Sequence, residues 1–282
     1  MSTVIEDQRD SLLQKIWEEH RGWVLTCAAL VISLAVWKVH GTETVFPKSW
    51  IEAFPFADKV NEFDKWIRPF IQPTTRAIGA GVTWFYELVV DWLTFTQWQI
   101  VFVILVLPAF AYGGLRLGLL AVFAVGSWLV LDMWDAAMET LSLMCISIAI
   151  SVTIGVLFGI MASQNDRFET IIKPILDTMQ TLPAFIYLIP AFYLFGLGAP
   201  GAILATVIYA LPPVVRLTNL GIRQVPADID EAATSFGATK IQSLVKVKIQ
   251  MAMPAIKLGI NQTVMMALAL VVLATFIAAP GL

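Results

Sequence analysis

Charged residues, and the residue types that build catalytic sites, are scarce in this sequence. Asp, Glu, Lys and Arg make up 14% of its 282 residues, whereas soluble domains contain about 25%, so an ordinary soluble protein is excluded. The net charge of −3 provides no basic field for phosphates, which excludes nucleic acid as a partner. Neither the two cysteines, Cys27 and Cys145, nor the two histidines, His20 and His40, have a partner at metal-ligand spacing. We therefore expect neither a disulfide framework nor a metal site.

Motifs for nucleotide binding and hydrolysis are also missing. The sequence has no GxxxxGK[ST] phosphate loop, no GxSxG nucleophile elbow and no HExxH zinc pair. Its nearest approach to a phosphate loop, at residues 237–240, lacks the upstream glycine. Three acids near one turn, Asp132, Asp135 and Glu139, are typical of helix ends and first turns. We predict that the chain is not an enzyme, has no catalytic residues and binds no cofactor of its own.

Long apolar stretches are what the sequence has instead, since 58% of its residues are hydrophobic. They predict an all-α integral membrane protein, a polytopic helical bundle of about seven spans. The predicted spans are Gly22–Trp37, Trp98–Tyr112, Leu117–Met133, Leu141–Met161, Leu182–Phe195, Gly201–Val215 and Met253–Ala279. The first is short for a hydrocarbon core of ~30 Å, but a tryptophan stands near each of its ends. A signal peptide is disfavoured there, because a long acidic stretch precedes it and it has no small-residue cleavage site.

Two regions are predicted along the chain. Residues 1–94 form an N-terminal region that contains the short first span, and residues 95–282 form the transmembrane domain. Residues 1–21 predict a short interfacial helix. Farther along, apolar residues recur at helical spacing before and after Pro73. These predict two amphipathic helices, which either lie in the membrane interface or form a soluble cap on the outer face.

A polar segment from Gln224 to Pro254 interrupts the apolar helices. Asp228 and Glu231 have the spacing of a capping box at a helix start. Gly237 stands where a residue in the left-handed conformation ends such a helix. The segment therefore begins with a short helix that is capped at both ends.

A second short helix is predicted to follow. Thr239 and Gln242 repeat the capping-box spacing, and apolar residues then recur on one face beside lysines. The apolar positions are Ile241, Leu244, Val245 and Ile249, and the lysines are Lys240, Lys246 and Lys248. Two capped amphipathic helices between membrane spans indicate a surface that presses against a partner.

A short motif within this segment carries a family resemblance. It consists of Glu231-Ala232-Ala233, then Gly237 after three more residues, and the apolar pair at Val247 and Ile249. The pattern resembles the EAA loop of permease subunits of ABC importers, although Gln250 stands where that family usually has proline. The resemblance implies that the loop is cytoplasmic and docks on a separate ATP-hydrolysing subunit. The ATPase-coupling residues it implies are Asp228, Glu231, Ala232, Ala233, Gly237, Thr239, Ile241 and Leu244.

Three longer blocks carry a more specific resemblance. They occupy residues 176–190, 210–226 and 259–268. All three are similar to the permeases of glycine betaine, proline betaine and choline importers. The similarity implies a type I ABC importer permease fold in the plasma membrane and uptake of a betaine-like compatible solute. It also implies a further external segment and at least one more span after the last residue given.

The same resemblance implies the partners of the chain. These are a second permease copy, two ATPase subunits that carry ATP and Mg, and an extracytoplasmic solute-binding protein. If the loop is inside, alternation places residues 1–21, 113–116, 162–181 and 216–252 inside too. Those segments hold eleven of the eighteen Lys and Arg residues, which agrees with a cytoplasmic loop.

Aromatic residues crowd the predicted span Leu182–Phe195, and aromatic faces are what recognise a quaternary ammonium. At about 100° per residue, Phe185, Phe192 and Phe195 fall within an arc of roughly 80°, and Tyr187 points away from it. We predict that the three phenylalanines line the solute path. Core packing and an interfacial aromatic belt are the alternatives.

Two amides in the last predicted span, Asn261 and Gln262, are further path candidates. Polar side chains at such positions either bond between helices or face a wet pathway.

Two other functions compete with an ATP-driven importer. An ion-coupled secondary transporter would favour inverted repeats and ionisable residues on broken helices, but the predicted span interiors hold almost no carboxylates. A membrane sensor or scaffold would use the polar loop to dock a signalling partner.

Overall fold

The computed structural model describes residues 22–23, 26–35, 38, 56–277 and 279–281, and every regular element in this part of the chain is a helix. The prediction of an all-α protein is confirmed. Contacts divide the chain into two compact units, Met1–Ile67 and Arg68–Leu282, and each is described by itself. The predicted division between residues 94 and 95 stays a prediction.

The first unit contains an apolar helix, Thr26–Ala35, whose side chains are exposed. It covers the middle of the predicted span Gly22–Trp37, but Trp37 lies outside the described residues. The interfacial helix predicted for residues 1–21, and both histidines, also lie outside them. At 1.5 Å per residue the described helix is about 15 Å long, which is half of what a crossing needs.

Helix α3, Phe56–Phe95, continues through Pro69 and Pro73, so the prediction of two separate helices was wrong. A proline inside a helix removes a backbone hydrogen bond and disfavours the preceding turn. Packing outweighs this local cost, because Tyr86 belongs to the main buried cluster of the second unit and Val82 packs against it.

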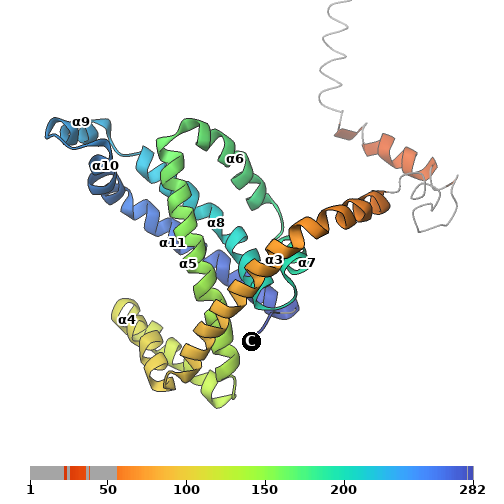
Figure 1. Cartoon of the computed structure of the whole chain (residues 1–282), viewed down its shortest axis with the longest axis horizontal. Helices are drawn as coiled ribbons and strands as arrows, with labels where there is room; N and C mark the ends of the chain where they lie inside the picture. Colours follow the sequence, from red (N-terminus) through yellow and green to blue (C-terminus); the bar gives the residue numbers. More distant parts are fainter. Residues whose placement is uncertain (1–21, 24–25, 36–37, 39–55, 278, 282) are drawn as a thin grey trace, which may run out of the picture. The chain divides into compact units, whose positions relative to one another are not determined.

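The other elements of the second unit follow in order along the chain (Figure 1). They are α4 (Trp98–Val130), α5 (Trp134–Gln164), α6 (Asp166–Thr181), the 3₁₀ helix η1 (Ala184–Tyr187), α7 (Leu188–Phe195), α8 (Ala199–Arg223), α9 (Ala227–Ser235), α10 (Lys240–Ser243), the π-helical turn η2 (Leu244–Lys248) and α11 (Ile249–Ile277). Four helices in the described residues are long and apolar enough to cross a membrane: α4, α5, α8 and the continuous stretch Lys240–Ile277. A fifth crossing results if α6 and η1–α7, which meet at 114°, form one span. The predicted count of about seven spans is not confirmed.

Helix α4 folds back on itself at Gly114. This glycine has φ +70° and ψ −172°, a conformation that a side chain would disfavour. The ring of Phe110 occupies the space where a side chain on Gly118 would stand. In a straight helix these two residues would be about 12 Å apart along the axis. The predicted tight hinge at residues 113–116 is therefore confirmed, and the two predicted spans beside it are the two arms of α4.

Both ends of α4 reach the start of α5. Val101 from the first arm and Trp128 from the second pack in one cluster with Met138 of α5, which is fully buried. The two arms thus return to the same end of α5.

Helices α5, α8 and α11 pack side by side through small or β-branched residues that recur at every fourth position (Figure 1). These positions are Ser147, Ser151, Gly155 and Gly159 in α5, Thr206, Ala210, Val214 and Thr218 in α8, and Ala255, Gly259, Thr263 and Ala267 in α11. A Cβ atom on Gly159 would stand 2.8 Å from the carbonyl oxygen of Val215. The Thr263 hydroxyl donates to the Ala210 carbonyl at 2.9 Å. Close backbone approach and hydrogen bonds between helices stabilise bundles in lipid, where apolar burial gives little driving force.

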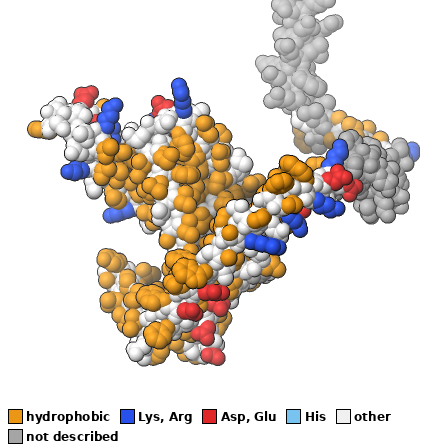
Figure 2. Space-filling model, in the orientation of Figure 1, with side chains coloured by type: hydrophobic (Ala, Val, Ile, Leu, Met, Phe, Trp, Pro, Cys, Tyr) orange, Lys and Arg blue, Asp and Glu red, His pale blue; other side chains and the backbone are white. Residues whose placement is uncertain are grey.

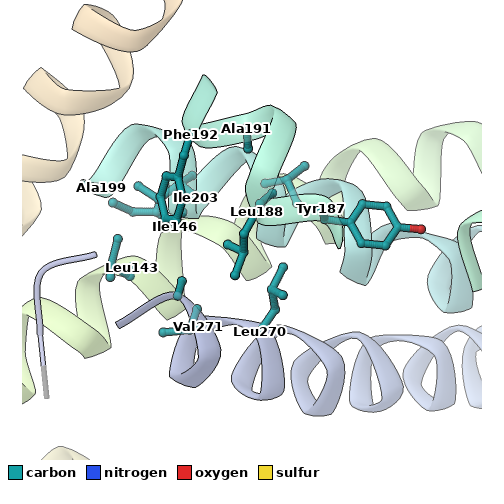
Figure 3. Packing of buried hydrophobic residues seen from close by; sticks show 14 of the residues in the cluster. Leu143, Ile146, Tyr187, Leu188, Ala191, Phe192, Ala199, Ile203, Leu270 and Val271 are labelled. Atoms are coloured by element: carbon teal, nitrogen blue, oxygen red, sulfur yellow. The ribbon is translucent and has the colours of Figure 1, made fainter. Parts of the chain in front are cut away.

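Larger apolar side chains from α5, η1, α7, α8 and α11 meet in one buried cluster, and Figure 3 shows their convergence. Phe192 of α7 is 9% exposed. Its ring lies against Gly201 of α8, where an added Cβ atom would be 2.5 Å from the ring. The short helix α7 is held on the bundle by this cluster.

The visible surface of the second unit is largely apolar, with charged side chains near α9, α10 and α6, along α3, and in an acidic group where α3 ends and α5 begins (Figure 2). Large exposed side chains include Phe123, Met265 and Phe276, the last of which is 83% exposed. Apolar surface of this extent marks contact with lipid or with other proteins.

Candidate functional site

The coupling segment, defined here as α9, α10 and η2 (residues 227–248), lies at the end of the bundle where α8 ends and α11 begins (Figure 1). None of the α9 residues is buried, and these include Glu231, Ala232 and Ala233. The helix ends in a Schellman motif. The Gly237 N–H donates to the Thr234 carbonyl at 2.9 Å, and the Ala238 N–H donates to the Ala233 carbonyl at 3.1 Å. Gly237 has φ +86°, so the prediction of a left-handed residue at this position is confirmed.

The two predicted capping boxes have different outcomes. Thr239 and Gln242 form the predicted box at the start of α10, with backbone-to-side-chain distances of 3.3 and 2.9 Å. The box predicted from Asp228 and Glu231 is wrong. Pro226 takes the N-cap position, so Asp228 lies inside the helix and its Oδ1 accepts only from the adjacent Ile229 N–H at 3.0 Å.

The predicted apolar stripe divides into two parts. Leu244 and Ile249 pack against the cluster formed by Ile222 of α8 and Ala252 and Ile256 of α11. Ile241 stays 74% exposed, and Val245 is half exposed. Phe236, at the corner after α9, is 94% exposed and was missed from the sequence. One side of the segment therefore joins the bundle, and the other side presents apolar groups outward.

Asp230 joins α9 to the residues that follow it. Its Oδ1 accepts a hydrogen bond from Ser243, and its Oδ2 lies 2.8 Å from Nζ of Lys248. The bond from Lys248, and then that from Ser243, hold the pKa of the Asp230 carboxyl below its usual value. Sequence reasoning missed this contact, because the three residues are near one another only in the folded loop.

A second polar network anchors the end of α8. Arg223 donates to the Ala162 carbonyl at 2.8 Å and pairs with Asp166 at 2.7 Å and Glu169 at 3.1 Å. Asn219 completes the network by donating to Glu169 at 2.8 Å. The residue that precedes the loop is thereby tied to the end of α5 and to the first turns of α6.

A pocket of about 240 Å³ lies between α6 and α8, beside this network. Ile172, Leu176 and Val215 supply apolar walls, and Arg216 also lines the pocket and pairs with Asp177. Ion pairs at both ends of α6 therefore hold that helix against α8.

The predicted aromatic span is bent rather than straight. After α6 the chain turns at Leu182 and Pro183, and Tyr187 donates across this elbow to the Met179 carbonyl. Because a 3₁₀ helix precedes α7, the angles of a single α-helix do not apply. The shared face predicted for the three phenylalanines is therefore wrong. Phe192 and Tyr187 are both buried in the main cluster, whereas Phe185 is 53% exposed.

The remaining path candidates lie on accessible faces. Phe195, the last residue of α7, is half-buried, and Asn261 and Gln262 of α11 are exposed. Of three pockets in the described residues, Phe195 lines one, and the other four path candidates line none of the three.

Comparison with known proteins now connects these features. The profile of the family described as "Binding-protein-dependent transport system inner membrane component" matches residues 151–282. Over 231 residues the chain is 40% identical to the glycine betaine transport system permease protein OpuAB of Bacillus subtilis, covering 81% of each. The chain belongs to this family of transport permeases. It is 42% identical over 241 residues to the glycine betaine/carnitine transport permease protein GbuB of Listeria monocytogenes, covering 83% of this chain and 81% of that protein.

A further relative is the glycine betaine/proline betaine transport system permease protein ProW of Escherichia coli, 38% identical over 231 residues. The match covers 81% of this chain and 64% of ProW. Membership confirms the predicted ABC importer permease, a multi-pass inner-membrane transport component that is not itself an enzyme. It sets aside both the ion-coupled transporter and the membrane sensor.

Proposed function

We propose that this chain carries a betaine-like compatible solute across the cytoplasmic membrane as half of a paired permease. The relatives OpuAB, GbuB and ProW are all named for glycine betaine transport. A solute of this class has a quaternary ammonium, which aromatic faces bind, and a carboxylate. An extracytoplasmic binding protein would deliver the solute and select it.

The coupling segment carries the second part of the proposal, docking on a separate ATPase subunit. The supporting observation is the exposure of Phe236 and Ile241 beside the charged side chains of α9 and α10 (Figure 2). Large apolar side chains that protrude among charged ones are typical of a protein interface. Two such ATPase subunits would bind ATP and Mg, and the segment would be cytoplasmic.

We assign the solute path through the permease pair to residues whose side chains are not buried in the core. Phe185, Phe195, Asn261 and Gln262 are the path residues that we propose. Phe192 is buried on Gly201, so we assign it to positioning α7 in the conformation described.

Docking is tested by copurifying the ATPase with Phe236→Asp and Glu231→Lys variants of the permease. Phe236→Asp puts a charge into the proposed interface and Glu231→Lys reverses one, so we expect at least a tenfold loss of bound ATPase, about 1.4 kcal/mol, at normal permease levels. Arg167→Glu is the matched control, since this arginine is exposed on α6 outside the segment. Wild-type recovery of ATPase with both variants would refute the docking surface.

Orientation is tested with single cysteines at positions 241 and 59 after Cys27 and Cys145 are replaced. Ile241→Cys should react with impermeant thiol reagents only from the cytoplasmic side, and Lys59→Cys only from outside. The reverse pattern would invert the topology.

A further inference from the structure

The two residues that hold Asp230 are five positions apart in the chain, at 243 and 248. In a regular α-helix, residues five apart point about 140° away from each other. They could not both face the same carboxylate. Here the intervening residues Leu244–Lys248 form a π turn, in which the Ile249 N–H donates to the Leu244 carbonyl. A π turn closes hydrogen bonds over five residues, which brings positions i and i+5 onto one side.

We propose that Asp230, Ser243 and Lys248 form a latch that fixes α9 to the start of α11, so that the coupling segment and α11 move as one body. All three are positioning residues. The inference rests on the proposed function, because it gives this rigid connection the role of passing ATPase movement into the membrane helices.

The attachment of α9 shows why such a latch matters. The helix has no buried residue and no side-chain cap at its start. Within the described residues, the two bonds to Asp230 are the side-chain bonds that join α9 to α10 and η2. The Arg223 network anchors α8 and does not reach α9. Without the latch, α9 would keep its fold but lose its fixed angle to α11.

A buried hydroxyl and a second bond to the same carboxylate distinguish the latch from an ordinary surface ion pair. Exposed pairs contribute little, because water screens them and long side chains lose entropy. Ser243 is only 2% exposed, and the side chains of Lys248 and Asp230 are 25% and 36% exposed. Both carboxylate oxygens are used, each by a different partner. The contact therefore fixes the orientation of α9 relative to η2 as well as the distance between them.

The test uses the complete complex of permease, ATPase and binding protein in liposomes, with glycine betaine as the solute. Solute uptake and ATP hydrolysis are measured together for Asp230→Asn, Lys248→Met and the exchange Asp230→Lys with Lys248→Asp. We expect each single change to lower the solute carried per ATP at least about fivefold. ATPase binding and the unfolding temperature of the bundle should stay at wild-type values, and the exchange should recover at least half of the ratio.

Matched controls are Asp135→Asn at the start of α5 and Lys257→Met in α11, both exposed and both outside the coupling segment. Neither should change the ratio. Deleting Val245, which is half exposed, shortens the π turn to α-helical spacing. Residues four apart share one face of an α-helix, so this deletion should keep Ser243 and Lys248 on the same carboxylate and leave the ratio at its wild-type value.

Three outcomes would overturn the latch. Wild-type solute-to-ATP ratios in both single variants would show that the contact positions nothing. Loss of ATPase binding in those variants would make Asp230 and Lys248 docking contacts instead. Failure of the exchange to recover any transport would show that the two residues act separately. If the wild-type permease bound no ATPase, the proposed function itself would fail, which is a distinct result.

Discussion

The bundle of α5, α8 and α11 and the coupling segment adjoin in the chain, yet different contacts hold them. In the bundle, small residues such as Gly159 and Gly259 bring backbones together, and buried hydroxyls bond across helices. In the coupling segment, caps, one carboxylate and a left-handed glycine fix short helices that bury almost nothing. Dense packing resists deformation, whereas the segment depends on a few directional bonds. A densely packed bundle that ends in a short segment held by polar bonds is suited to transmitting the movement of a partner.

The largest expected loss of stability comes from truncating a side chain in the buried cluster that holds α7. Phe192→Ala removes a ring that is 9% exposed and should cost roughly 3–5 kcal/mol, seen as a lower unfolding temperature in detergent. Phe185→Ala, at a 53% exposed position, should cost about 0.5 kcal/mol or less. It should nevertheless lower solute uptake at matched protein levels. Equal stability loss in both variants would contradict the assignment of Phe192 to the core.

A smaller effect is expected from adding one methyl group between α5 and α8. In Gly159→Ala the new Cβ would stand 2.8 Å from a backbone oxygen that cannot move freely. Overpacking of this kind costs roughly 1–3 kcal/mol. Gly126→Ala is the matched control in α4, since nothing lies within 4 Å of its Cβ position. It should be neutral, or more stable by up to about 1 kcal/mol through helix propensity.

Losing one cap should affect the coupling segment alone. Thr239→Ala breaks the capping box of α10 and should cost about 1 kcal/mol locally. Hydrogen exchange should speed up at the first amides of α10 while the bundle keeps its protection. Thr234→Ala, near the end of α9, serves as the comparison. Loss of protection in α5 or α11 would show that the two regions unfold together.

The smallest effect is expected from pH. Because the folded pKa of Asp230 lies below its ordinary value of 3.8, its stabilising contribution is fully present above that value. It is lost only as pH falls through the lower folded pKa. The solute-to-ATP ratio of wild type relative to Asp230→Asn should therefore stay constant between about pH 5 and 8. A steep change in that window would contradict the depressed pKa.

Local signals in the sequence predicted local structure well. Gly237 and the Thr239–Gln242 box were identified because a left-handed residue and a capping box depend on neighbours in the chain. The elbow before α7 could have been predicted from the sequence. Leu182 precedes Pro183, and the residue before a proline disfavours the helical conformation. The capping box expected at Asp228 failed because Pro226 had already set the helix start.

Contacts between distant residues could not be predicted in this way. The π turn, the Asp230–Lys248 pair and the Arg223 network each depend on how α9 and α6 lie against other helices. The continuous helix through Pro73 likewise depends on packing at Tyr86. Path residues were hardest, because their prediction assumed one straight helix where the chain has an elbow.

The fold-back at Gly114 decides on which side of the bilayer distant residues lie. A chain that enters the membrane and turns back emerges on the side from which it entered, whether its arms cross fully or only dip in. Since both arms of α4 return to the start of α5, the end of α3 and the start of α5 share one side. If Gly114 took helical angles, α4 would cross the membrane once and end on the opposite side. Every residue before Trp98 would then exchange inside for outside. The φ of one glycine thus sets the parity of the topology.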